Sequence, residues 1–370
     1  MSAFMFSFVL LTLLTKASPA SAEPCVVTQF DEVEAATKTC LDIVLDNLFV
    51  PANVTLKLNL TDGATVTFKG NITFGYAIWD GPLVTINGTS ITVKGAEGSV
   101  CDGQGQLYWD GQGGWSGPKP QFFTIQAFGG SVFRDIYVLN SPMDVVQVTN
   151  SDDVLFTNWV IDDSVGDKGV APTGKEGHNT DAFDVWNSTN VEIRDSIVYN
   201  QDDCLAVRCG ANVYVHDLFC HGSHGLSISV GFSNDSVPLN TLENVTIADS
   251  VIVNSDNGIH IKTHIDGGYG SIKNVTYRNI TMSDMNNFGI TIEQNYQNRA
   301  PGSTGTAEPK NNVPISDLKM INVTGTVGSK AVPIHIVCAE DGCFDWSWSG
   351  VSVTGKKSND CNYEPQGYSC

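Results

Sequence analysis

The chain has 370 residues and carries 40 acidic residues against 20 Lys and Arg, which gives a formal net charge of −20 at pH 7. A chain this acidic lacks the basic surface that phosphate binding requires, so nucleic acid is excluded as a partner. The charge suits an acidic medium, in which partial protonation relieves self-repulsion, and an anionic substrate would need a local cluster of positive groups.

The first predicted element is a secretory signal peptide over residues 1–22. Residues 4–15 are almost wholly apolar, and Ala20-Ser21-Ala22 is typical of a cleavage site. The alternative is a buried N-terminal helix. Neither this run nor any later one reaches the ~18 apolar residues of a membrane span. We therefore expect a secreted, extracellular protein without a membrane segment, folded as one catalytic domain over residues 23–370 that is long enough for a large core.

The ten cysteines fit an oxidising compartment. Local spacing favours disulfides between Cys25 and Cys40, Cys204 and Cys220, Cys338 and Cys343, and Cys361 and Cys370. Cys101 and Cys209 are left over, and the sequence does not decide whether they pair. The cysteines are not spaced with histidines as in a zinc site, so we expect no metal.

Asn-x-Ser/Thr sequons are frequent, and in a secreted chain some of them should carry glycans. Others fall within strand-like runs, where the Asn and Thr side chains can pack or hydrogen-bond instead. The candidates are Asn53, Asn59, Asn71, Asn87, Asn187, Asn234, Asn244, Asn274, Asn279 and Asn322.

Beyond a short helix near residues 31–38, the chain shows no amphipathic helical period. Short Val- and Ile-rich runs alternate with Asn, Asp, Gly and Ser, which is typical of strands and turns. Related runs begin at Asp153, Asn190, Asn212, Asn244, Asn274 and Asp317. A period of roughly 20–30 residues without helices indicates a solenoid of about ten coils. The prediction is an all-β, single-domain, right-handed parallel β-helix. The alternative, a β-sandwich, would need alternating strands and regular hairpin turns.

The third strand of successive coils brings polar residues together. The runs in register are "DAFDV" from Asp181, "DCLAV" from Asp203, "HGLSI" from His224 and "NGIHI" from Asn257. Residues in one column of a parallel stack are about 4.8 Å apart per coil. We therefore expect Asp181, Asp203 and His224 to be neighbours on three coils, with Asp202 one residue before the column.

His260 and Lys262 lie further along the same strand of the next coil. Three carboxylates, a histidine and a lysine in one outer patch suit acid–base hydrolysis. Repulsion should raise the pKa of at least one aspartate, which then protonates a leaving group while another aspartate activates water. Lys262 supplies a cation for an anionic sugar.

Other interpretations of this patch are ordinary turn residues, an Asn-Asp ladder, or a calcium site formed by the carboxylates. The histidine and the lysine argue against a strongly anionic cage. His216, His221 and His264 lack the shared register and are interpreted as structural.

Four motifs occur in order on this repeat pattern: "NTD" at 179–181, "QDD" at 201–203, "SHG" at 223–225 and "IKT" at 261–263. They resemble the polygalacturonases of glycoside hydrolase family 28. The similarity runs from about Cys25 to Cys370 and includes "WDG" at Trp109, "KPQFF" at Lys119 and "QNYQNRAP" around Tyr296. The surroundings of the lysine and the C-terminal tail look most like the endo-acting members.

The resemblance implies a role for each matching position. Asp202 would be the general acid, Asp181 and Asp203 would hold and deprotonate the attacking water, and His224 would tune or reprotonate the acid. Lys262 would bind a galacturonate carboxylate, with Asn179 and Tyr296 positioning the sugar. The family inverts configuration and needs no cofactor or metal. The partner would be pectin or polygalacturonate, with a protein inhibitor as a further candidate and a monomeric state.

One position departs from the family, which usually has an arginine two residues before the lysine where this chain has His260. Histidine is cationic only below about pH 6.5 unless its surroundings shift it. Three outcomes are open: activity confined to acid, an altered substrate or product pattern, or a pectin-binding homologue without turnover. With every acidic residue retained, we expect an endo-polygalacturonase. An exo-acting or related pectin-backbone hydrolase and a calcium-dependent pectate lyase are the alternatives.

Overall fold

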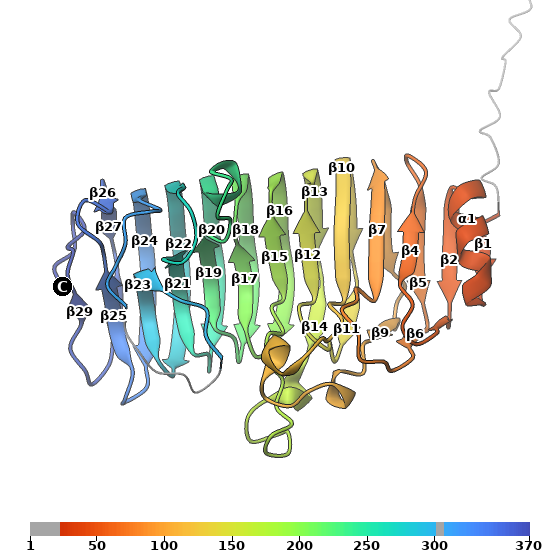
Figure 1. Cartoon of the computed structure of the whole chain (residues 1–370), viewed down its shortest axis with the longest axis horizontal. Coiled ribbons are helices and arrows are strands. Elements are labelled where there is room, and N and C mark those ends of the chain that lie inside the picture. The colour runs from red at the N-terminus through yellow and green to blue at the C-terminus, as the bar shows by residue number, and fades with distance from the viewer. Residues whose placement is uncertain (1–22, 301–306) are drawn as a thin grey trace, which may run out of the picture.

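The computed structural model describes residues 23–300 and 307–370, so the predicted signal peptide lies outside the described residues. The strands stack side by side along the long axis of the molecule (Figure 1), and every pairing between named strands is parallel. Three stacks of strands wind around one apolar interior. The fold is the predicted parallel β-helix. Among the described residues, no helix is long and apolar enough to span a membrane.

The first two stacks run separately through the N-terminal half. The first contains β1 (Cys25–Val27), β2 (Asp42–Asp46), β5 (Thr65–Lys69), β8 (Thr92–Gly95), the second half of β10 (Phe123–Arg134) and β13 (Asp152–Thr157). The second contains β3 (Phe49–Val50), β6 (Asn71–Phe74), β9 (Val100–Asp102), β11 (Tyr137–Leu139) and β14 (Val160–Asp162).

From β16 onward, single long strands continue both stacks. These are β16 (Ser188–Tyr199), β18 (Gly210–His221), β20 (Thr241–Val253), β22 (Ser271–Met285) and β24 (Ile315–Val327), followed by the short strands β26 (Cys343–Phe344), β27 (Ser347–Ser349) and β28 (Ser352–Thr354).

The third stack faces the viewer in Figure 1 and positions the polar residues of interest. It contains β4 (Leu56–Asn59), β7 (Val84–Thr89), the first half of β10, β12 (Val146–Thr149), β15 (Phe183–Trp186), β17 (Asp203–Val207), β19 (Gly225–Val230), β21 (Asn257–His264), β23 (Phe288–Tyr296), β25 (Val332–Val337) and β29 (Asp360–Cys361).

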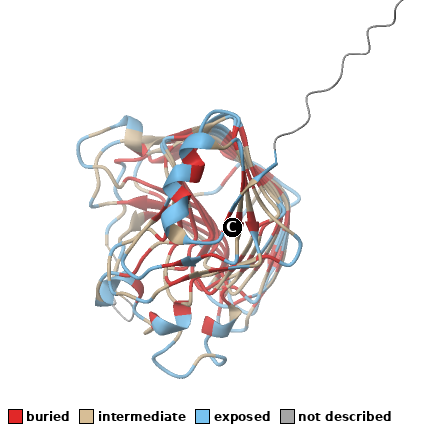
Figure 2. Ribbon diagram, turned by 90° about the vertical axis from the view of Figure 1, so that its right-hand side faces the viewer, coloured by how far each residue is buried: buried red, intermediate tan, exposed pale blue. Residues whose placement is uncertain are grey.

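The helices are short and lie at one end or in loops. The predicted helix exists as the 3-10 turn η1 (Phe30–Glu32) followed by α1 (Val33–Thr39), which lies across the N-terminal end of the coil (Figures 1 and 2). Its buried residues Val33 and Ala36 close the apolar interior against water. The remaining 3-10 turns are η2 (Gly105–Leu107), η3 (Gly113–Ser116), η4 (Ser164–Gly166) and η5 (Pro238–Asn240).

Inward-facing side chains from successive coils form one continuous apolar core. Figure 2 colours as buried the parts of the ribbon to which buried residues belong. Aromatic rings extend one row, with centroids 6.3 Å apart for Phe68 and Phe123, 5.7 Å for Phe123 and Trp159, and 6.0 Å for Trp159 and Phe183. Each is at most 1% exposed. Burial of each such side chain contributes roughly 1.5–3 kcal/mol to the free energy of folding. A chain with few charged residues therefore favours this coil.

The repeated Asn-Val pairs mark a corner of the coil. Asn190, Asn212, Asn244 and Asn274 all have positive φ, a conformation that asparagine tolerates better than most residues. The side-chain amides of the last three donate to the side-chain Oδ1 of the Asn one coil earlier, at 3.0, 3.1 and 2.8 Å, and that of Asn190 donates to Asp152 Oδ1. An Asn ladder therefore exists, but at this corner and not at the "QDD" motif. The sequons at Asn244 and Asn274 take part in it, and glycan occupancy stays a prediction.

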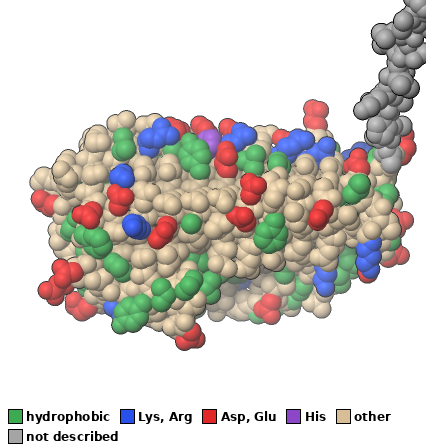
Figure 3. Space-filling model, turned by 90° about the horizontal axis from the view of Figure 1, so that it is seen from above, with side chains coloured by type: hydrophobic (Ala, Val, Ile, Leu, Met, Phe, Trp, Pro, Cys, Tyr) green, Lys and Arg blue, Asp and Glu red, His purple; other side chains and the backbone are tan. Residues whose placement is uncertain are grey.

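The structure contains the four disulfides suggested by local spacing: Cys25–Cys40, Cys204–Cys220, Cys338–Cys343 and Cys361–Cys370. Cys101 and Cys209 are both buried and unpaired, which answers the question left open by the sequence. Asp and Glu side chains are scattered over the face seen in Figure 3, in keeping with the net charge of −20.

Candidate active site

A cleft of about 550 Å³ lies over the outer face of β17, β19 and β21. All eight predicted catalytic and substrate-binding residues lie in or beside it: Asn179, Asp181, Asp202, Asp203, His224, His260, Lys262 and Tyr296. The loop containing η3 contributes Trp115, and the loop before β15 contributes His178. Stacking of coils thus brings together groups that lie more than a hundred residues apart.

The register differs from the predicted column at one coil. Asp181 and Asp203 do align, because the backbone N–H of Ala182 donates to the carbonyl of Asp203 at 2.9 Å. On the next coil, however, Asp203 pairs with Gly225 and Leu205 with Leu226, so Cys204 is an extra residue. The prediction that His224 shares the column of Asp203 was wrong, because an ungapped alignment cannot show such a bulge.

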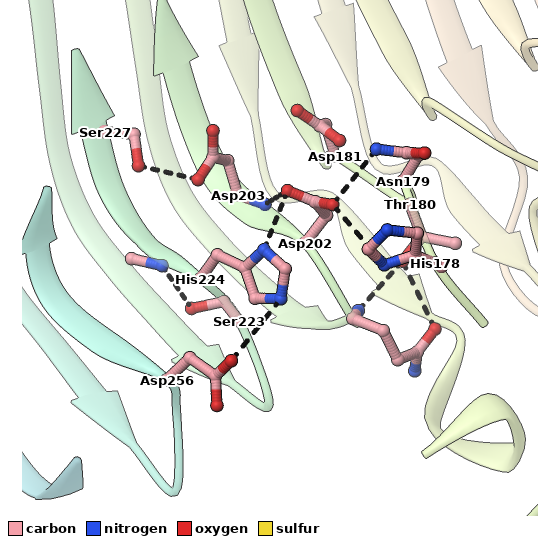
Figure 4. A network of polar contacts seen from close by, with 12 residues as sticks. His178, Asn179, Thr180, Asp181, Asp202, Asp203, Ser223, His224, Ser227 and Asp256 are labelled. Carbon is pink, nitrogen blue, oxygen red and sulfur yellow. Dashed lines mark hydrogen bonds and ion pairs between the residues drawn. The ribbon is translucent and has the colours of Figure 1, made fainter. Parts of the chain in front are cut away.

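The bulge places His224 beside Asp202 instead (Figure 4). The backbone N–H of His224 donates to the Asp202 carbonyl at 2.7 Å, and its Nδ1 lies 3.0 Å from Asp202 Oδ1. Asn179 Nδ2 donates to the other carboxylate oxygen at 3.2 Å. Burial alone would raise the pKa of Asp202, but the neighbouring His224, with Lys262 and His178, holds that pKa well below its usual range.

His224 is the complementary partner in this pair. Burial acts to lower its pKa, but the charge and hydrogen bond of Asp202, and then Asp256, raise the pKa of His224 to about 9. Its Nε2 lies 3.6 Å from Asp256 Oδ2. In mild acid the pair therefore exists as an imidazolium and a carboxylate that share one proton across a 3.0 Å contact.

The sequence predicted a raised pKa for the aspartate that protonates the leaving group, but the raised pKa falls on Asp181 and not on Asp202. Burial and the charges of Asp202, Asp184 and Asp144 together raise the pKa of Asp181 well above its usual value. Burial and Asp184 likewise raise the pKa of Asp144 to about 7. The proton that the clustered carboxylates retain in mild acid therefore sits toward Asp181 and Asp144, away from Asp202.

Asp203 forms a buried ion pair with Lys262, whose Nζ is 2.6 Å from its Oδ2. Ser227 Oγ donates to the other oxygen at 2.7 Å. Burial acts to lower the pKa of Lys262, but Asp203 and further neighbours raise it above its usual value, so the ammonium keeps its charge. The same ammonium lies 5.4 Å from the centroid of the Tyr296 ring, and both face the cleft.

His260 is less available as a cation than a free imidazole. Its Nε2 lies 2.8 Å from Glu293 Oε2, a partner that sequence reasoning missed. Burial and the charge of Lys262 lower the pKa of His260, against the opposing effect of Glu293. A permanent charge at this position is therefore absent, as the departure from the family pattern suggested.

Of the three histidines interpreted as structural, one lines the cleft. His264 Nε2 lies 3.0 Å from Ser229 Oγ, and its ring contacts Phe232 at a centroid distance of 3.9 Å. Burial lowers the pKa of His264 to about 3, so it stays neutral. His216 and His221 contact residues of the long strands instead.

Two groups of side chains within the described residues have metal-ligating atoms within 4.8 Å of one another: Asp202, Asp203 and His224, and Asp144, Asp181 and Asp184. Each group has a fixed cation in contact. Lys262 and the imidazolium of His224 neutralise the first, and Arg208, whose Nη2 is 2.7 Å from Asp184 Oδ2, neutralises the second. Neither donor set therefore fits a calcium cage, which consists of uncompensated oxygen ligands.

Sequence reasoning missed several charged residues that line the cleft, namely Asp144, His178, Arg208, Asp256 and Arg299, and two that contact cleft residues, Asp184 and Glu293. Two of these residues could have been found from the sequence. The register pairs Ser229 and Glu293 with Lys262, and Arg208 follows one residue after the pair Val207–Ile228. Extending the predicted column along the strand would have found Arg208 and Glu293. His178 and Asp256 lie in turns, whose path no repeat pattern predicts.

Comparison with known proteins agrees with this geometry. The family model described as glycosyl hydrolases family 28 matches residues 40–370. A polygalacturonase of Phaedon cochleariae is 44% identical over 363 residues, covering 96% of each chain. Endopolygalacturonase I of Aspergillus oryzae is 46% identical over 349 residues, covering 94% of this chain and 91% of the relative.

Among solved structures, endopolygalacturonase I from Stereum purpureum, complexed with two galacturonates, superposes with a TM-score of 0.78 at 33% identity. The match covers 91% of this chain and 96% of that one. A polygalacturonase from Erwinia carotovora, at 17% identity and a TM-score of 0.66, shares the fold. By the family model and by its relatives, the chain belongs to glycoside hydrolase family 28.

Proposed function

We propose that this chain is an endo-polygalacturonase, which hydrolyses the α-1,4-galacturonosyl links of de-esterified pectin. The observation that carries the proposal is the convergence of Asp181, Asp202, Asp203, His224 and Lys262 on one cleft. The family membership and the relatives named endopolygalacturonase support the same activity.

Asp202 acts as the general acid. As the bond between the anomeric carbon and the glycosidic oxygen breaks, that oxygen takes a proton from Asp202. Asp202 is an anion in the free cleft, but His224 Nδ1 holds a proton 3.0 Å away and returns it to the carboxylate. A bound galacturonate adds negative charge to the cleft, which favours the protonated acid. General acid catalysis of this kind contributes typically 10²–10⁴-fold in rate.

Asp203 and Asp181 hold the attacking water on the opposite side. The water oxygen bonds to the anomeric carbon while its proton passes to a carboxylate. Asp203, paired with the Lys262 ammonium at 2.6 Å, is the better base of the two, because the raised pKa of Asp181 leaves that group protonated in mild acid. Asp181 then positions the water by hydrogen bonding. Attack from this side inverts the anomeric configuration.

Lys262, Asn179 and Tyr296 bind the sugar. The ammonium of Lys262 is the charge partner for a galacturonate carboxylate, and the Tyr296 ring beside it provides an apolar face for the sugar. Asn179 has its amide in contact with Asp202, so it positions the acid as well as the substrate.

The test combines two assays on polygalacturonate. Endo-hydrolysis gives a rapid fall in viscosity together with new reducing ends and mixed oligomers. Monomer as the sole product would indicate an exo-acting enzyme, and an ultraviolet-absorbing product that requires calcium would indicate a lyase. Saturable binding without new reducing ends between pH 4 and 8 would leave only a pectin-binding protein and refute the proposal.

We also propose that the protein acts outside the cell as a monomer, with residues 1–22 as its signal peptide and a protein inhibitor as a candidate partner. The ten cysteines, eight of them in disulfides, support an oxidising location. N-terminal sequencing of the protein recovered from culture medium tests the cleavage near Ala22, and light scattering tests the monomer.

A further inference from the structure

The cleft has few positive charges to offer a polyanion. Carboxylates line much of it, and the chain as a whole has a net charge of −20. Lys262 is already in contact with Asp203 at 2.6 Å, and His260 is bonded to Glu293. An acidic polysaccharide therefore draws on the further cations that line the cleft, which are Arg208 and Arg299.

Arg208 is such a cation and is built into the sheet. It follows β17 directly, and its backbone N–H donates to the Val185 carbonyl at 2.9 Å. The preceding pair Val207–Ile228 places Arg208 in line with Ser229, which pairs with Lys262 on the coil beyond. The two cations therefore lie in one outward column, separated by two coils or about 10 Å of stack.

The contacts of Arg208 hold its guanidinium in place but leave donors free. Nη2 lies 2.7 Å from Asp184 Oδ2 and 3.5 Å from Asp181 Oδ2, whereas Nε is buried and makes no hydrogen bond. A guanidinium has five N–H donors, so these contacts do not use them all. The group lies 5.0 Å from the centroid of the Phe232 ring, and the side chain is 22% exposed on the cleft.

We propose that Arg208 binds a carboxylate of the polygalacturonate chain, next to the sugar whose carboxylate Lys262 binds. A planar guanidinium suits a carboxylate, because two parallel N–H donors match its two oxygens. Arg208 thereby supplies the permanent charge that His260 does not. The inference rests on the proposed function, since it takes polygalacturonate as the substrate. The competing role is purely structural: neutralisation of Asp184 and Asp181.

The experiment compares Arg208→Gln and Arg208→Lys with the wild-type chain. Arg194→Gln is the matched control, because Arg194 pairs with Glu192 and Asp195 on β16 and does not line the cleft. KM and kcat are measured on polygalacturonate, and the Kd of a galacturonate oligomer is measured by calorimetry, each at 50 and 200 mM NaCl.

We expect Arg208→Gln to raise KM and Kd about ten-fold at low salt, the scale of a lost hydrogen bond to a charged group. Their salt dependence should weaken, because one charge pair has gone. Arg208→Lys keeps the charge without the fork and should raise KM about three-fold. Arg194→Gln should change neither constant.

A change in kcat with KM and Kd unchanged would overturn the proposal and leave the structural role. If Arg208→Gln does not fold, an unchanged KM in Arg208→Lys decides against the proposal in the same way. A wild-type chain that neither cleaves nor binds the polymer refutes the proposed function and the Arg208 assignment together. Cleavage and tight binding by both wild type and Arg208→Gln refute only the assignment.

Discussion

The Asp202→Asn substitution tests the core of the proposed mechanism. In the wild type, the backbone N–H of Asp203 donates to Asp202 Oδ1 at 2.9 Å. An amide has the shape of a carboxylate, so the oxygen of the variant side chain can still accept this hydrogen bond. It carries no transferable proton. We expect kcat to fall by about 10²–10⁴-fold, the usual contribution of a general acid, which corresponds to about 3–5 kcal/mol in the activation barrier. KM should change little, because Lys262 still binds the carboxylate of the substrate.

The same variant has a second readout that reports the geometry directly. Burial disfavours the charged form of His224, and the Asp202 carboxylate is the main group that raises the pKa of His224 to about 9. Without that carboxylate the pKa should fall, and NMR titration of the histidine ring measures it. Asp62→Asn, in an exposed turn, is the matched control and should leave kcat and the titration unchanged. Wild-type turnover in Asp202→Asn would remove Asp202 from the mechanism.

Three further predictions concern charge. Lys262→Gln leaves Asp203 buried without its partner and should lower the free energy of unfolding, measured by urea titration, by about 3–5 kcal/mol. The control Lys69→Gln, at an exposed pair with Asp46, should lower it by less than about 1 kcal/mol. Equal losses in the two variants would contradict the burial argument. His260→Arg adds a permanent charge to the cleft, and because the pKa of His260 is lowered, the variant should have a lower KM already below about pH 6.5. An unchanged KM between pH 4 and 8 would mean that residue 260 supplies no charge. Because its pKa is raised in the folded state, His224 adds to the free energy of unfolding. This contribution is fully present below about pH 6.5 and is lost as the pH rises through about 9. Thermal melts should therefore show this loss in the wild type but not in His224→Gln.

The repeat pattern was sufficient to predict the coil and the convergence of the motifs. Apolar strands of similar length, separated by Asn-rich turns, can bury their side chains only by stacking, and stacking in parallel aligns each strand with its counterpart. For that reason the positions of Asp181, Asp203 and Lys262 on one face followed from the sequence, as did the local disulfides such as Cys204–Cys220.

Only the tertiary structure decided how the groups pair and where the protons lie. The bulge at Cys204 moves His224 from Asp203 to Asp202, and a one-residue shift of this kind costs too little to leave a mark in a repeat pattern. The raised pKa falls on Asp181 because its surroundings contain four more buried carboxylates, three of them from other coils. Pairings such as His260 with Glu293 and Arg208 with Asp184 depend on distances across coils, and it is those distances that determine which charges remain for a substrate.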